Sequence, residues 1–175
     1  MAECCECATD FVATARKQAA KIKKSYFHHN LTHVKKLFRS DITVEKLNAY
    51  SLNTMVGHLG IQVIEIGEDF IVAKMPVDHR THQPYGLLHG GASVALAETL
   101  GSLAAHCTID DENRYCVGLE INANHIKSVK SGFVFGATRP IHVGSRTQVW
   151  EIKITNEQGE LVCVSRITMA VIDRR

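Results

Sequence analysis

The sequence predicts an α+β fold in which an antiparallel sheet wraps around one long apolar helix. Three observations support this prediction. Segments that alternate polar and apolar residues, as strands do, lie on both sides of a single helical segment of small apolar residues. The turns between these segments are short, which implies antiparallel pairing. One helix against one sheet is an α+β arrangement, and such a sheet can bury the helix on most sides.

The composition is that of an ordinary globular protein with one domain and a sizeable core. The chain has 175 residues, a net charge of +2 and no low-complexity tract, so neither nucleic acid nor an acidic partner is indicated. The longest apolar run contains Glu98, and we expect no membrane span and no secretory signal. The six cysteines have no disulfide-framework spacing, which favours reduced thiols in a cytoplasmic protein.

Residues 1–40 differ from the rest and are interpreted as a basic helical extension of a domain that spans residues 41–175. They carry eight lysines or arginines against three acidic residues, a net charge of about +5. Apolar residues at rough helical spacing leave a basic opposite face, which fits a membrane-surface or nucleic-acid arm. A solvated helical extension or partly disordered tail is the interpretation we favour. The Cys4, Cys5 and Cys7 cluster could bind a soft metal, but no second pair of ligands stands at a familiar spacing.

The elements of the domain are expected in the following order. Residues 41–51 form a short helix with Asp41 or Thr43 as its cap. A loop over residues 78–87 leads into the central helix, which ends near His106. Two strands precede the helix and four follow it in a meander, at residues 60–66, 70–77, 115–125, 132–140, 147–155 and 161–172.

The stretch from Gln83 to Ser102, QPYGLLHGGASVALAETLGS, carries the candidate chemistry. Glycines let a ligand approach the backbone, and the first N–H groups of a helix have no partners inside it. The helix dipole also favours negative charge there, so this helix start can bind an anion or stabilise an oxyanion. Glu98 follows Gly90 by eight residues, about 12 Å along the axis and near the same face. A substrate carbonyl is therefore expected between the helix start and the carboxylate.

Each of these residues also has a purely structural interpretation. Glu98 would then be a paired carboxylate, since burial without a partner is costly. The Gly90–Gly91 pair would serve close helix–strand packing, His89 would cap the helix, and Gln83 would belong to the Pro-Tyr-Gly turn. Other hydrolase or nucleotide motifs are absent from the sequence: there is no G-x-S-x-G elbow, no P-loop and no dinucleotide fingerprint.

Three segments, in order, resemble one protein family. They are MPVDHRTHQPYGLLHGGASVALAETLGS, VGLEINANHIKS and HVGSRTQVWEIKI, and the resemblance covers roughly residues 42–172. They are similar to the hotdog-fold acyl-CoA thioesterases. The similarity is greatest to the branch that contains 1,4-dihydroxy-2-naphthoyl-CoA hydrolase of menaquinone biosynthesis and the proofreading thioesterase of enterobactin synthesis. The resemblance implies the hotdog fold, whereas residues 1–40 match nothing in the compact family members.

The resemblance also implies a reaction, the hydrolysis of an acyl-CoA thioester to a carboxylic acid and CoA without a metal or organic cofactor. Glu98 would be the catalytic carboxylate, which either attacks the carbonyl or activates a water. The Gly90 N–H would stabilise the oxyanion. Gln83 would position the thioester or water, and His89 would hydrogen-bond near the carbonyl or leaving sulfur. Ser102 matches a polar position that contacts the carboxylate or its water.

Binding roles follow from the same resemblance. His125, at the end of the INANH segment, matches a residue at the acyl pocket or CoA channel. For the CoA phosphates the resemblance points to Ser145 and Arg146 in the HVGSR turn, with Lys127 and Ser128 after His125. Arginine and lysine supply charge, and the backbone of the turn supplies hydrogen-bond donors. The alternative for Arg146 and Lys127 is that they are solvated surface charges.

The implied substrates are aromatic acyl-CoA thioesters, with 1,4-dihydroxy-2-naphthoyl-CoA first and benzoyl-CoA types next. Medium-chain acyl-CoA and acyl carrier protein thioesters are alternatives, as are a hotdog dehydratase or hydratase and a non-catalytic acyl-CoA-binding regulator. Glu98 argues against the regulator, because a ligand sensor needs no carboxylate at the thioester. We expect a homotetramer with active sites at subunit interfaces, because an open edge strand and the open side of the helix need cover.

Overall fold

The computed structural model describes residues 37–110 and 112–174. Most of the basic extension predicted for residues 1–40, and its cysteine cluster, lie outside the described residues. The boundary of the extension and its role therefore stay predictions. None of the described helices combines the length and the apolar content that crossing a bilayer requires.

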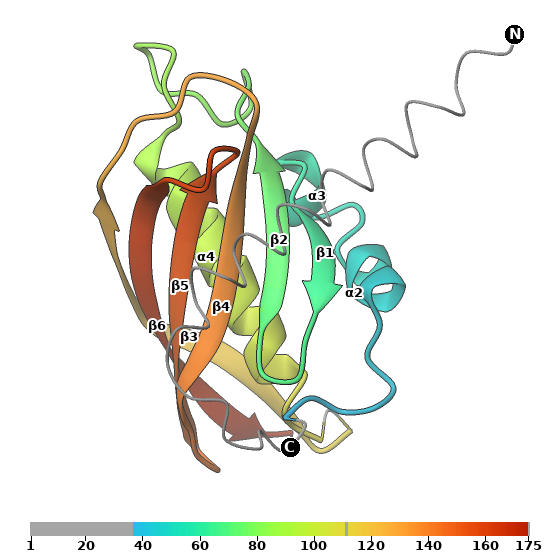
Figure 1. The fold of residues 1–175 in the computed structure, drawn as a ribbon. Coiled ribbons are helices and arrows are strands. Elements are labelled where there is room, and N and C mark those ends of the chain that lie inside the picture. Colours follow the sequence, from blue (N-terminus) through green and yellow to red (C-terminus); the bar gives the residue numbers. More distant parts are fainter. Residues whose placement is uncertain (1–36, 111, 175) are drawn as a thin grey trace, which may run out of the picture. The chain divides into compact units, whose positions relative to one another are not determined.

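One curved antiparallel sheet and one long helix, α4 (Gly90–His106), make up most of the described chain (Figure 1). The strand order is β1-β2-β4-β5-β6-β3, and every neighbouring pair is antiparallel. Helix α4 packs against β2, β3, β4, β5 and β6. The strands are β1 (Gln62–Ile66), β2 (Ile71–Pro76), β3 (Arg114–His125), β4 (Phe133–Val143), β5 (Thr147–Asn156) and β6 (Leu161–Asp173). The predicted α+β hotdog architecture is confirmed.

The predicted meander is wrong for β3. Only β4, β5 and β6 follow one another across the sheet, while β3 pairs with β6 at the outer edge. The connection at residues 126–132 crosses one end of the sheet to reach β4, which lies beside β2 (Figure 1). Three strand spacings amount to about 14 Å, which seven residues span easily, so the length of a turn does not identify its strand pairing. The crossing makes β3 an outer strand.

Two short helices precede the sheet. Helix α2 (Val44–Tyr50) begins after Thr43, whose hydroxyl accepts a hydrogen bond from the Lys46 N–H, as predicted for this cap. The four-residue helix α3 (Met55–His58) was not predicted, because it is too short to show a periodic pattern. Asn48 of α2 binds both backbone groups of Val63, at 2.8 and 2.9 Å. The Asn48 side chain therefore satisfies the Val63 N–H and C=O groups that a further strand would pair with at the outer edge of β1.

The core forms where α4 meets the sheet. Leu96 and Leu100 are fully buried, and so are the large side chains of the central strands, among them Trp150, Ile152, Ile167 and Met169. Glycines allow the close approach: a Cβ on Gly136 of β4 would lie 2.5 Å from Leu100 Cδ1, and a Cβ on Gly101 would overlap the Ile167 side chain. This close packing fixes the rotation of α4 and hence the direction in which its polar residues point.

The change in the free energy of unfolding caused by Gly101→Ala tests this packing, because helix propensity and close packing predict opposite signs. In an open helix the change from glycine to alanine stabilises by roughly 0.5–1 kcal/mol. Here the added methyl meets Ile167, which is fully buried and cannot move aside without disturbing the core. We expect the free energy of unfolding, measured by urea titration, to fall by roughly 1–3 kcal/mol. A more stable variant would show that α4 and β6 are not tightly packed.

Candidate active site

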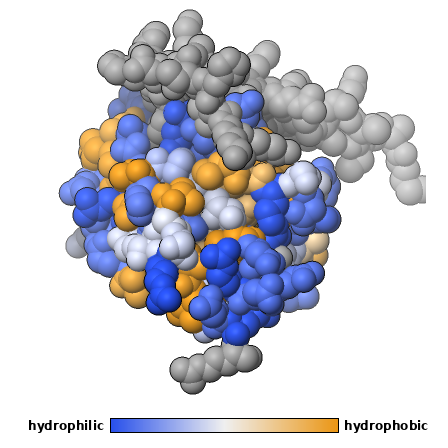
Figure 2. Space-filling view, turned by 90° about the horizontal axis from the view of Figure 1, so that it is seen from below, coloured by the Kyte–Doolittle hydropathy of each residue, from blue (hydrophilic) through white to orange (hydrophobic). Residues whose placement is uncertain are grey.

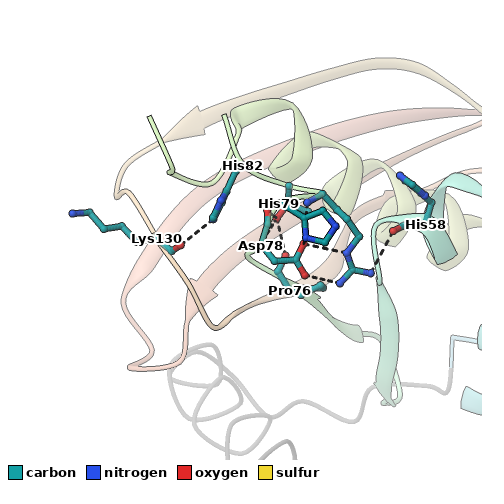
Figure 3. Close-up of polar contacts among 8 residues, drawn as sticks. His58, Pro76, Asp78, His79, His82 and Lys130 are labelled. Carbon is teal, nitrogen blue, oxygen red and sulfur yellow. Dashed lines mark hydrogen bonds and ion pairs between the residues drawn. The ribbon is translucent and has the colours of Figure 1, made fainter. Parts of the chain in front are cut away.

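The loop from Asp78 to Leu88, which leads into α4, begins with an ion pair (Figure 3). Arg80 donates to both carboxylate oxygens of Asp78, from Nε at 3.1 Å and from Nη2 at 2.6 Å. It also donates to the His58 carbonyl at 3.4 Å. The hydrogen bonds from Arg80 hold the pKa of Asp78 well below its usual range. The pair is therefore charged at neutral pH, and the hydrogen bond from Arg80 to the His58 carbonyl ties the loop to α3.

Further hydrogen bonds connect this loop to the helix start. The Thr81 hydroxyl donates to the Pro76 carbonyl at 2.9 Å, and the Thr81 carbonyl accepts from the His89 N–H at 2.8 Å. His82 Nε2 lies 2.9 Å from the Lys130 carbonyl, so this nitrogen carries a proton (Figure 3). The loop is thus fixed to both β2 and the 126–132 connection. These contacts were not predicted from the sequence, and they set the positions of the site residues that follow.

His89 caps helix α4. Its Nδ1 accepts a hydrogen bond from the Gly91 N–H at 2.8 Å, which leaves Nε2 as the protonated nitrogen of a neutral ring. The structural alternative for His89 is therefore realised, while the exposed Nε2–H is still available to a ligand. The N–H of Gly90, at the first helical position, lies where an α-helix offers no internal partner.

His125 lies directly against Gly90. A Cβ placed on Gly90 would lie 2.7 Å from His125 Nε2, so any other residue at position 90 would displace the imidazole. The two belong to one cavity of about 300 Å³. The sequence-predicted Gln83, Gly90, His125, Lys127 and Ser128 all line it. Its other lining residues are Leu87, Leu88, Ser93, Ile126 and Val162.

Gln83 has the turn contact that was the structural alternative for it, and Ser93 is a lining residue that was not predicted. Gln83 takes part in the turn, since its Oε1 accepts from the Tyr85 N–H at 2.8 Å, so its NH₂ group is the part that can bind a ligand. Ser93, only 2 % exposed, was missed. It follows Gly90 by three residues and so shares its helix face, a spacing that is visible in the sequence.

Glu98 is not among the residues that line this cavity. The half-buried carboxylate lies against β3, where a Cβ on Gly118 would approach Oε1 to 2.7 Å. Ser102 Oγ donates to the same oxygen at 3.3 Å, the pairing that the family resemblance implies. Gly118 and His125 are seven residues apart on β3, about 23 Å along an extended strand. Within one chain, the structure therefore places the carboxylate and the helix start at different points along β3.

Ser145 and Arg146 lie at the other end of the sheet, in the turn between β4 and β5. They line a second cavity of about 530 Å³ together with Arg114, Val171, Ile172 and Asp173. Figure 2 views the protein from this end, where hydrophilic and hydrophobic residues alternate in small patches. The residues predicted to bind the CoA phosphates are thus divided between two cavities, one lined by the first residue of β3 and the other by its last.

Lys127 forms an ion pair with Glu160, Nζ to Oε1 at 2.6 Å, and both side chains are about half exposed. The hydrogen bonds from Lys127 and Asn156 lower the pKa of Glu160. The charge of Lys127 is therefore largely compensated within the chain. Ser128 beside it is exposed at the cavity.

No group of three or more His, Cys, Asp or Glu side chains in the described part of the chain has the arrangement to hold a metal ion. Cys107, Cys116 and Cys163 are free thiols, and burial raises the pKa values of Cys116 and Cys163. Thiols with raised pKa are poor nucleophiles at neutral pH.

Comparison with known proteins identifies the family. The profile described as "Thioesterase superfamily" matches residues 85–163, which include Gly90, Glu98 and Arg146. The chain is 52% identical over 136 residues to 1,4-dihydroxy-2-naphthoyl-CoA hydrolase of Escherichia coli, a match that covers 78% of this chain and 99% of the relative. It is 51% identical, over 78% of its length and 98% of the relative, to the proofreading thioesterase EntH of Cronobacter turicensis.

A solved structure agrees with these relatives. The crystal structure of a mutant of thioesterase PA1618 from Pseudomonas aeruginosa superimposes with a TM-score of 0.78 at 46% identity. The superposition covers 79% of this chain and 99% of that chain. The chain therefore belongs to the thioesterase superfamily, in the group of 1,4-dihydroxy-2-naphthoyl-CoA hydrolase and EntH, and it is a thioester hydrolase with the hotdog fold.

Proposed function

We propose that this protein hydrolyses the thioester of an aromatic acyl-CoA, with Glu98 as the catalytic carboxylate. The observation that carries the proposal is a half-buried carboxylate, held by Ser102, on the same helix whose start presents the Gly90 N–H. The name of the Escherichia coli relative gives the substrate class, a hydroxylated naphthoyl-CoA. Hydrolysis breaks the C–S bond, adds the hydroxyl of water to the acyl carbon and returns a proton to the CoA sulfur.

The attack on the carbonyl carbon and the negative charge that develops on the carbonyl oxygen need different groups. Ser102 binds Glu98 Oε1, so Oε2 is the oxygen that attacks the carbonyl or takes a proton from water. The carbonyl oxygen gains negative charge in the transition state, and the Gly90 N–H at the positive end of α4 is suited to stabilise it. His125 and the NH₂ of Gln83 would hold the thioester beside Gly90. Apolar lining residues such as Leu88, Ile126 and Val162 suit an aromatic acyl group.

The separation of Glu98 from the Gly90 cavity supports an active site shared between two copies. Strand β3 is an outer strand, and exposed apolar side chains follow it at Tyr115, Val117 and Leu119. On the opposite outer strand, β1, Asn48 already occupies the backbone groups of Val63. The β3 edge is therefore the edge that needs a partner, and the partner proposed here is a second copy.

Antiparallel pairing of two β3 strands about a two-fold axis aligns the first half of each strand with the second half of the other. An axis between Ile121 and Asn122 places Gly118 of one copy opposite His125 of the second. Glu98, which lies against Gly118, then lies near the Gly90 cavity of the second copy. We propose that two such sites form in each dimer, and that dimers stack into the tetramer.

The first test is thiol release from benzoyl, hydroxynaphthoyl, phenylacetyl, hexanoyl and palmitoyl CoA thioesters. We expect the aromatic thioesters to turn over fastest, and Glu98→Ala to lose ~10³-fold or more in kcat, about 4 kcal/mol of transition-state stabilisation. Glu112→Ala, an exposed carboxylate outside both cavities, is the matched control and should keep full activity. Binding of CoA by a folded wild type that turns over no thioester would favour the regulator. Turnover that survives Glu98→Ala would mean that another residue is the catalytic carboxylate.

Gly118→Ala tests the position of the carboxylate without removing it. The added methyl would lie 2.7 Å from Glu98 Oε1, so the carboxylate must move. A displacement of about 1 Å in a catalytic group costs roughly 10²-fold, and we expect that loss in kcat with little change in melting temperature. Tyr115→Phe, on the same strand, should keep the wild-type kcat. Unchanged turnover by Gly118→Ala would contradict the placement of Glu98 against β3 in the active enzyme.

Leu119→Asp tests the open edge of β3. Leu119 is 63% exposed in the single chain, and a charge at this point opposes edge-to-edge pairing. We expect light scattering to give a multiple of the 19.4 kDa chain mass for the wild type and a single-chain mass for the variant. The variant should also lose its turnover, because the shared site needs both copies. Leu52→Asp changes an equally exposed leucine away from β3 and should alter neither. A fully active monomer would disprove the shared site.

A further inference from the structure

Two arginines that are far apart in the sequence line the same cavity at the start of β3. Arg114 is the first residue of β3, and Arg146 lies in the turn between β4 and β5. Both line the cavity of about 530 Å³, and Ser145 and Asp173 are its other polar lining residues. The cavity therefore holds two positive charges and one negative charge.

Neither arginine is neutralised by a neighbour. Among residues 37–110 and 112–174, no carboxylate lies within ion-pair distance of the Arg114 or Arg146 guanidinium, and neither group forms a side-chain hydrogen bond. Asp173 lines the same cavity but pairs with neither. By contrast, Lys127 in the other cavity is bound to Glu160 at 2.6 Å. The unpaired positive charge of the described cavities is thus concentrated at the Arg114 end.

The shape and chemistry of this cavity suit the phosphate groups of a nucleotide. Guanidinium groups bind phosphate oxygens through paired hydrogen bonds, and two of them favour a doubly charged anion. Ser145 offers a hydroxyl, while Val171 and Ile172 supply an apolar wall. A volume of about 530 Å³ lies in the range of small-molecule sites.

We infer that Arg114 is a phosphate-binding residue, which together with Arg146 holds the nucleotide end of the CoA thioester. The inference rests on the proposed function, to which it adds Arg114 and a direction for the substrate. The β3–β3 pairing that brings Glu98 of one copy to the His125 end of the second also brings Arg114 to that end. The nucleotide then lies on the copy that supplies Glu98, and the carbonyl lies at Gly90 of the other copy.

The test compares a complete substrate with one that lacks the nucleotide. We expect Arg114→Met to raise KM for benzoyl-CoA by roughly 10- to 100-fold, the effect of losing a hydrogen bond to a charged group, with kcat nearly unchanged. KM for S-benzoylpantetheine, which carries no phosphate, should stay at its wild-type value. Arg114→Lys keeps the positive charge without the planar guanidinium, so its KM for benzoyl-CoA should lie between those of the wild type and Arg114→Met. Arg166→Met removes an exposed arginine outside the cavity and should change neither KM.

A KM for benzoyl-CoA that Arg114→Met leaves unchanged would overturn the inference, as would equal increases for both substrates. Calorimetry with adenosine 3′,5′-bisphosphate separates this inference from the proposed function. If the wild type hydrolyses no thioester, binding of the bisphosphate that is lost in Arg114→Met and kept in Arg166→Met still supports the phosphate site. Equal binding by wild type and Arg114→Met would overturn it, whatever the activity. Circular dichroism of each variant confirms that it is folded.

Discussion

The burial of α4 is the constraint on which the rest of the structure depends. The helix carries small and apolar residues on nearly all sides, and the sheet must curve around it to remove them from water. Gly101 and Gly136 let the sheet come so close that the helix cannot rotate. The polar residues of α4 are consequently fixed in direction: Gly90 faces His125, and Glu98 with Ser102 faces Gly118.

The wrapped sheet has a second consequence, an open outer strand. Asn48 hydrogen-bonds to the outer edge of β1, whereas β3 carries exposed apolar side chains. Strand β3 also lies beside both Glu98 and the start of α4. The proposed shared site accounts for the separation of the carboxylate from the helix start within one chain, because pairing along β3 would reunite them. Under that proposal the same edge serves assembly and catalysis, so a change in one is expected to alter the other.

Local sequence patterns predicted the positions of the strands and helix starts, but not which strands far apart in the sequence pair with each other. The alternation of residues located the strands, and Thr43 and the His-Gly-Gly sequence located the starts of α2 and α4. Sequence spacing did not predict that β3 pairs with β6, because residues 126–132 are long enough to reach several strands. Nor did it predict that the residues assigned to the CoA phosphates, Ser145 and Arg146 with Lys127 and Ser128, line two cavities at opposite ends of β3 within one chain. Ser93 and the Asp78–Arg80 pair are local and visible in the sequence, but they show their importance only once the cavity is known.

The most direct test of the shared site mixes two inactive variants. Glu98→Ala lacks the carboxylate and Gln83→Ala lacks a group in the Gly90 cavity, so each pure variant should be nearly inactive. After the two are mixed, dissociated and reassociated, each mixed dimer should contain one site with both residues intact. We expect benzoyl-CoA hydrolysis to return to about a quarter of the wild-type rate for equal amounts and random pairing. Activity no greater than the average of the two variants would show that Glu98 and Gln83 act within one chain.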